Sequence, residues 1–85
     1  MARYRLQFKK SVAKDLRSLP KKDVKRILRR IESLAEDPRP AGCEKLTGRE
    51  VLRVRQGRYR ILYEIKDDVL IVLVIKIGAR DTVYR

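Results

Sequence analysis

Apolar and charged residues alternate over the stretch 51–65, on both sides of the dipeptide Gln56-Gly57. Strict alternation predicts β-strands, and a glycine-containing dipeptide between two such runs predicts a hairpin. With Gln56 and Gly57 as the two loop residues, Arg55 faces Arg58 and Arg53 faces Arg60. Opposed residues of an antiparallel pair share a face. The predicted arginine face holds Arg53, Arg55, Arg58 and Arg60, and the predicted apolar face holds Leu52, Val54, Tyr59, Ile61 and Tyr63.

Two amphipathic helices are expected before this hairpin. A short strand over 4–8 comes first, followed by Ser11, a candidate N-cap for a helix that Pro20 ends. The second helix is expected from Lys21 to Ala35, because its apolar residues recur close to every 3.6 positions. These segments predict a helical hairpin with one apolar side.

A last strand is expected from Val69 to Ile77, where nearly every residue is apolar. Such a run is typical of a strand in the middle of a sheet and buried on both faces. The dipeptide Asp67-Asp68 predicts the turn before it, and Gly78 is expected to end it.

The order strand–helix–helix–strand–strand–strand predicts one α+β domain over residues 1–85. We expect an antiparallel-rich, four-stranded sheet with the helical hairpin packed on one face. Because the first strand must be joined to the sheet by a crossover, the two helices would form that crossover. The arginine face would then be the open face of the sheet.

The net charge changes this picture, because 23 Lys and Arg stand against 11 Asp and Glu, a formal charge of +12. Such an excess predicts a polyanionic partner: nucleic acid, an acidic protein or an anionic membrane surface. No apolar run approaches the ~20 residues of a membrane span, and the N-terminus lacks the apolar segment of a signal peptide. Cys43 is the single cysteine and histidine is absent, so we expect a reducing cytoplasm and no Cys/His metal site within one chain.

Arginines gathered on one strand face indicate a phosphate-binding face. Like charges directly opposed destabilise a sheet, and the planar guanidinium matches phosphate with two parallel donors. An ordinary solvated face of a very basic protein is the alternative interpretation. The same two interpretations apply to the basic helices. Further candidate phosphate or RNA contacts are Lys22, Lys25 and Arg26 on the second helix, and Lys45 and Arg49 before the hairpin.

The order of elements, together with the segments 45–48, 53–65, 78–80 and 83–84, resembles toxins of the RelE/ParE superfamily, on the RelE side. The resemblance covers essentially the whole chain and implies the microbial RNase-like RelE fold. It implies the toxin half of a toxin–antitoxin pair, with an acidic, RelB-like antitoxin as partner and operator DNA bound only through their complex. RelE-type toxins are endoribonucleases that cut mRNA in the ribosomal A site, so mRNA and the ribosome are implied as targets, without a cofactor.

The resemblance also implies a mechanism in which the 2′-hydroxyl of the RNA attacks the neighbouring phosphate, leaving a cyclic 2′,3′-phosphate and a 5′-hydroxyl. This reaction needs charge stabilisation, a base and an acid. By resemblance, Arg60 is the phosphate-clamping arginine, Arg80 the arginine after the last strand and Tyr84 the C-terminal tyrosine at the substrate. Arg53 and Arg55 stand where well-studied RelE toxins have lysine.

The identity of the general base stays open. Arginine in a protein does not lose its proton, so Arg53 and Arg55 can stabilise charge but are poor bases. Tyr84 is then the leading candidate, with Glu64 and Glu50 as alternatives.

Two other functions stay open at this point. One is a ParE-type toxin on the same fold, which inhibits DNA gyrase without cutting RNA. The other is a small basic module that binds nucleic acid or regulates an operon without catalysis. A neighbouring reading frame for a small acidic antitoxin would argue against the second.

Overall fold

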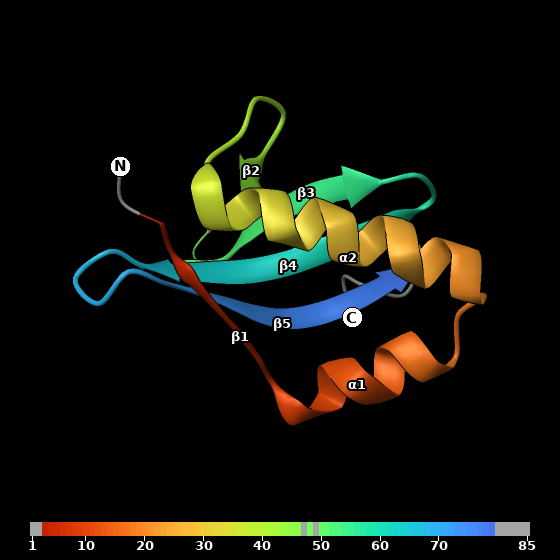
Figure 1. The fold of residues 1–85 in the computed structure, drawn as a ribbon. Coiled ribbons are helices and arrows are strands. Elements are labelled where there is room, and N and C mark those ends of the chain that lie inside the picture. The colour runs from red at the N-terminus through yellow and green to blue at the C-terminus, as the bar shows by residue number, and fades with distance from the viewer. Residues whose placement is uncertain (1–2, 47, 49, 80–85) are drawn as a thin grey trace.

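The computed structural model describes residues 3–46, 48 and 50–79. Along the chain its elements are β1 (Arg5–Phe8), α1 (Lys10–Arg17), α2 (Lys21–Glu36), β2 (Glu44–Lys45), β3 (Leu52–Gln56), β4 (Tyr59–Lys66) and β5 (Ile71–Ala79) (Figure 1). The α+β class and the element order are therefore confirmed. The predicted four strands are wrong by one, because the two-residue β2 is too short to show alternation in the sequence.

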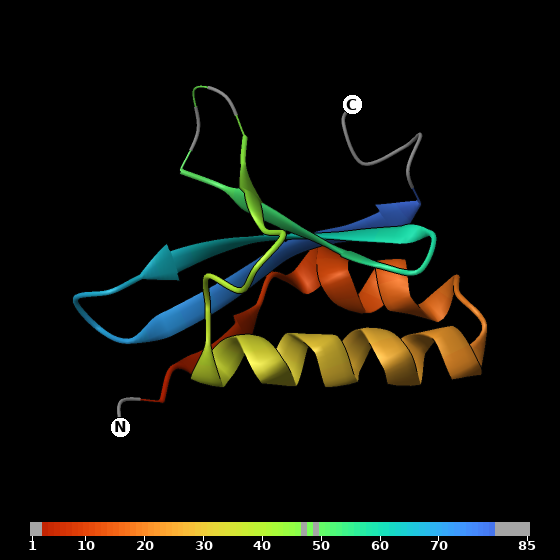
Figure 2. The ribbon, with the colours of Figure 1, turned by 90° about the horizontal axis from the view of Figure 1, so that it is seen from above.

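The five strands form one sheet in the order β1-β5-β4-β3-β2. β1 runs parallel to β5, and every other pair is antiparallel. The α1–α2 hairpin makes the crossover that the parallel pair requires. Both helices lie on the same side of the sheet, so the other face is open, as predicted (Figure 2).

The core lies between α2 and the sheet. Its fully buried residues are Val12 from α1, Ile27, Ile31 and Leu34 from α2, and Val54, Ile61, Tyr63, Val72 and Val74 from the strands. Burying such side chains stabilises the fold by roughly 1.5–3 kcal/mol each. The predicted apolar face of the hairpin is this core face, which orients β3 and β4 and thereby fixes which side their arginines occupy.

Three boundary predictions are wrong. α1 begins at Lys10 with Lys9 as its N-cap, so Ser11 lies inside the helix. The turn at Asp67-Asp68 extends through Leu70, which has a φ of +54°, so Val69 and Leu70 are exposed turn residues. β5 therefore starts later than expected.

β5 also differs from the prediction in its burial and its end. It lies between β1 and β4, with β4 at the centre of the sheet. Its residues alternate between buried and half-buried over most of its length, because neither of the helices in the described part of the chain covers the open face. Gly78 does not end the strand but pairs with Arg60 of β4 inside it. No helix among the described residues is long and apolar enough to cross a membrane.

Candidate functional site

The β3–β4 hairpin turns at Gly57 and Arg58, one residue later than predicted. Arg55 therefore faces Arg60, and Gln56 faces Tyr59. Gly57 has a φ of +60°, whereas Arg58 does not have a positive φ. A glycine at the first of two loop positions is the requirement of a type II′ turn. The predicted register is thus wrong by two residues, but a shift of two keeps every paired strand residue on its predicted face. Arg58, which was expected on the arginine face, is instead a turn residue.

Arg55 and Arg60 form a directly opposed pair on the open face, hereafter the arginine pair. Arg55 is exposed, but Arg60 is only 5% exposed. On its other side Arg60 faces Gly78, which has no side chain to occupy the space. The prediction for Arg60 is correct for its face and wrong for its exposure. The arrangement places two guanidinium groups on directly opposed residues, and their paired donors suit the oxygens of an anion.

Arg53 also lies on the open face but has an acidic partner. Its Nη2 donates to Oε2 of Glu44 at 2.7 Å, and its side chain is 13% exposed. Glu44 lies opposite Arg53 because β2 pairs with β3. Glu44 was not predicted as part of this face, since nothing in the sequence marks so short a strand. Arg53 therefore contributes less free charge to this face than predicted.

The remaining candidates near the hairpin are dispersed. Lys45 forms an exposed ion pair with Glu50 at 3.3 Å, a type worth little in stability. Glu64 is half-buried on the open face, opposite Leu73. The same face carries a small apolar cluster of Val51 and Leu62 with Leu46 and Ile75 packed against them. Arg49, Arg80 and Tyr84 lie outside the described residues.

The basic residues of α2 are not brought to the arginine pair. Lys22, Lys25 and Arg26 are exposed on a helix that covers the opposite face of the sheet. Arg58, in the turn, lies at the edge between the two sides. The structure therefore has two separate basic regions.

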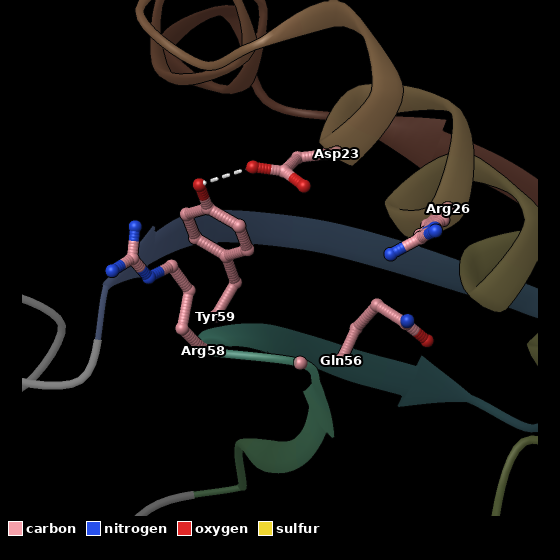
Figure 3. A pocket seen from close by; sticks show the side chains of 6 residues that line it. Asp23, Arg26, Gln56, Arg58 and Tyr59 are labelled. Atoms are coloured by element: carbon pink, nitrogen blue, oxygen red, sulfur yellow. Dashed lines mark hydrogen bonds between the residues drawn. The ribbon is translucent and has the colours of Figure 1, made fainter.

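Arg26 instead lines a pocket of about 270 Å³ between α2 and the hairpin turn, together with Asp23, Gln56, Gly57, Arg58 and Tyr59 (Figure 3). The Tyr59 hydroxyl donates to Oδ2 of Asp23 at 2.7 Å. This hydrogen bond to a carboxylate raises the pKa of Tyr59 above its ordinary value. Tyr59 therefore has a structural partner and stays protonated.

The other described tyrosines are held in the same state. The Tyr63 hydroxyl donates to the carbonyl of Pro38 at 2.7 Å, and burial raises its pKa well above its ordinary value. The Tyr4 hydroxyl donates to Asp67, and this bond raises the pKa of Tyr4. Within residues 3–46, 48 and 50–79 no group of three or more acidic or cysteine side chains is arranged to hold a metal ion.

Comparison with known proteins gives the family. Residues 6–84 match the profile of the ParE toxin family of the type II toxin–antitoxin system parDE. RelE1 of Methanocaldococcus jannaschii is 33% identical, in an alignment that covers 98% of this chain and 97% of that protein.

Solved structures agree with this assignment. The archaeal RelE of Pyrococcus horikoshii, solved in a complex with RelB, has a TM-score of 0.79 and 30% identity, with 96% of this chain and 99% of that chain covered. The isolated RelE toxin of E. coli has a TM-score of 0.78 and 27% identity, with 95% and 90% covered. The chain belongs to the RelE/ParE superfamily of toxins from type II toxin–antitoxin systems.

Proposed function

We propose that this toxin is an endoribonuclease that cuts mRNA on the ribosome by attack of the RNA's own 2′-hydroxyl. The observation that carries the proposal is the arginine pair: two opposed guanidinium groups on the open face, one exposed and one nearly buried. Two forked guanidinium groups on directly opposed residues suit the oxygens of a substrate phosphate. The proposed reaction uses no metal ion or cofactor, and it takes place in the cytoplasm, where ribosomes are.

Arg55 and Arg60 have the role of stabilising the pentavalent phosphorane. Donors fixed in advance at a developing charge typically contribute ~10²–10³ in rate each. The burial of Arg60 supports this role, because a charge in a water-poor site acts more strongly than one in water. Arg53, already bound to Glu44, helps to orient the site and adds positive potential. Arg80 completes the catalytic set by its place in the family's motif.

Tyr84 is the proposed general base. The chain has four tyrosines and no histidine, and Tyr4, Tyr59 and Tyr63 each donate to a protein acceptor that keeps them protonated. Arginine cannot take the proton. The positive charge of the arginine pair would lower the pKa of a tyrosine that acts there from its usual value of ~10. Glu64 and Glu50 are the reserve candidates.

The proposed partners follow from charge. Lys45, Arg49 and Arg58 near the hairpin, with Lys22, Lys25 and Arg26 on α2, would attract RNA over long range. An acidic RelB-like antitoxin is the proposed protein partner, supported by the relative from P. horikoshii that was solved with RelB. With a net charge of +12, complementary charge would mainly raise the association rate. Operator DNA would be bound only through the toxin–antitoxin complex.

A ParE-type inhibitor of DNA gyrase is the second candidate, since the matching family profile is described as ParE. A translation extract programmed with one mRNA separates the two. If the protein is a nuclease, adding it should stop protein synthesis and shorten the mRNA. DNA supercoiling by gyrase, measured in a parallel assay, should be unaffected. Inhibited supercoiling with intact mRNA would instead establish the ParE-type function, and neither effect would favour a non-catalytic binding module.

A further inference from the structure

A basic groove runs between α2 and the tip of the β3–β4 hairpin, on the side of the sheet opposite the arginine pair. It consists of two adjoining pockets that share Arg26 and Gln56. One, of about 270 Å³, extends to Arg58 and Tyr59 in the turn. The other, of about 380 Å³, extends along α2 and is lined by Arg26, Arg29, Arg30, Ser33 and Gln56. We call these two pockets together the α2–hairpin groove.

The groove is rich in donors and poor in acceptors. Its one acidic residue, Asp23, already accepts the Tyr59 hydroxyl. Among the described residues, no ion pair involves Arg26, Arg29 or Arg30. The Nε of Arg30 is buried and has no hydrogen-bond partner in the described part of the chain. Because a buried donor without an acceptor is unfavourable, these groups favour an anionic ligand.

The shape of the groove indicates which anion it takes. Figure 3 shows Gln56 and Arg26 pointing toward one another across the pocket, from the strand and from the helix. Forked guanidinium groups and an amide are side chains that proteins use on phosphate oxygens, whereas the Ser33 hydroxyl already donates to the Arg30 carbonyl. Tyr59 is buried and bound to Asp23, so it offers no face on which a base could stack. The groove therefore suits a phosphodiester backbone.

The position of the groove connects it to the proposed active site. Arg55 and Gln56 are adjacent on β3 and so point to opposite faces of the sheet. Arg58 lies in the turn that joins β3 to β4. We propose that the α2–hairpin groove binds the phosphodiester backbone of RNA that passes around this turn from the arginine pair. This inference rests on the proposed function, because it takes RNA as the ligand, and it adds a second, sequence-independent contact.

The salt dependence of RNA binding tests the proposal. All variants carry Arg55→Ala to prevent cleavage, and binding of a labelled single-stranded RNA is followed by fluorescence anisotropy over a range of salt concentrations. Each lost phosphate contact should lower the slope of log affinity against log salt by ~0.7. Adding Arg26→Ala and Arg29→Ala together should therefore lower the slope by ~1.4. The matched control, Lys14→Ala with Arg17→Ala, removes two charges from exposed positions of α1 and should leave the slope unchanged.

A second variant avoids deleting any side chain. Gln56→Glu keeps the size of the side chain and places a carboxylate where both pockets meet. It should weaken RNA binding several-fold, while the thermal midpoint is maintained because the new carboxylate can pair with Arg26. Weaker RNA binding with an unchanged thermal midpoint would support the proposal that the groove binds RNA.

Three results would overturn the proposal. The first is a groove variant that keeps the affinity and slope of its α1 control. The second is a groove variant that loses a co-purifying acidic protein but not RNA, which would assign the groove to that protein. The third is a parent protein that does not bind RNA at all. A different result would separate the two proposals. If the groove variants lose RNA affinity while the wild-type protein leaves mRNA on ribosomes intact, RNA binding by the groove is supported and the nuclease function is contradicted.

Discussion

Arg60 combines a permanent charge with a surface that is only 5% exposed. Its direct neighbours across the strands are another arginine, Arg55, and a glycine, Gly78. Arg53, two residues from Arg55, forms an ion pair with Glu44, with 2.7 Å between Nη2 and Oε2. The arginines of the hairpin are thus not equivalent: one is exposed, one nearly buried, one ion-paired and one in the turn. We expect their substitutions to have different effects for this reason.

Arg60→Ala should abolish most of the toxicity and leave the protein folded. The core cluster lies on the other face of the sheet, so its packing is retained, whereas the transition state loses a donor typically worth ~10²–10³ in rate. Arg60→Lys should restore only part of the rate, because lysine keeps the charge and loses the planar fork. Cleavage rates and urea unfolding curves check both expectations. Undiminished growth inhibition by a soluble, folded Arg60→Ala protein would exclude this residue from the site.

Tyr84 can be tested by separating its hydroxyl from its ring. If the hydroxyl is the general base, Tyr84→Phe should lose roughly 10²–10⁴ in cleavage rate, nearly as much as Tyr84→Ala. If the ring only stacks on a base, Phe should be active and Ala should lose ~1–3 kcal/mol of contact. Single-turnover cleavage on programmed ribosomes distinguishes the two, since product release then does not limit the rate. A fully active Phe variant would transfer the role to Glu64, Glu50 or a group outside the protein.

At the scale of elements, the hairpin shows what a sequence pattern determines. The alternation of 51–65 predicted correctly which residues face the helices, because any register shift of two preserves faces. It did not fix the loop, since Gly57 belongs to the loop in both registers and only the turn geometry decides between them. Nor did it reveal β2, and with it the hydrogen bond that Arg53 donates to Glu44.

The sequence pattern also did not predict how the edge of β5 is covered. β1 pairs with β5 only as far as Val74. Beyond this point α1 lies beside the strand, and the Ile77 N–H donates to Oδ2 of Asp15 at 3.2 Å. A carboxylate on a helix thus satisfies a backbone donor that a missing neighbour strand would leave exposed. Nothing in the sequence distinguishes Asp15 from an ordinary surface residue of α1.

Gly57→Ala tests the hairpin turn. The φ of +60° is in the left-handed region, which costs an L-residue roughly 1–2 kcal/mol. A Cβ at this position would meet nothing within 4 Å, so the loss should come from the backbone alone. We expect urea unfolding to show this destabilisation, and Gly57→Asn to lose less because asparagine tolerates the conformation better. An Ala variant as stable as the wild type would show that the turn adopts another geometry.

At the scale of the whole molecule, the sheet separates two basic regions. The arginine pair lies on the open face, and the arginines of α2 lie beside the hairpin tip on the helical side. The sequence predicted both regions and their separation, because the helices were expected on one face and the arginines on the other. It did not predict the α2–hairpin groove, because side chains 26–33 and 56–59 meet only through tertiary packing. Likewise Arg60 is paired with Gly78, eighteen positions away in the chain. Contacts of this kind have no local signature.

A hydrogen-bonded group of three side chains joins distant parts of the chain. It should contribute to the pH dependence of the protein's stability in acid. Asp67, in the β4–β5 turn, accepts two hydrogen bonds from Arg39 and one from the Tyr4 hydroxyl. Arg39, and then Tyr4, hold the pKa of Asp67 below its model-compound value of 3.8. A lowered pKa stabilises the folded state above the unfolded value, and this stabilisation is lost as the pH falls through the folded value.

Asp67→Asn should therefore lower the thermal midpoint slightly at pH 6, and the difference from wild type should disappear at pH values below the folded pKa. The effect is small because the ion pair is exposed. Asp68→Asn is the control, since within the described residues Asp68 makes no side-chain hydrogen bond or ion pair. Equal effects of the two substitutions at pH 6 would show that the contact contributes nothing beyond charge.

The proposed chemistry is tested most directly by the ends of cut mRNA. Purified protein is mixed in excess with ribosomes stalled on a defined mRNA, and the fragments are mapped and their termini identified in a single turnover. We expect cuts within the ribosome-bound codon that leave a 2′,3′-cyclic phosphate and a 5′-hydroxyl. Arg55→Ala should lower the cleavage rate by ~10²–10³. Intact mRNA, or fragments that carry a 5′-phosphate, would contradict 2′-hydroxyl attack at the arginine pair.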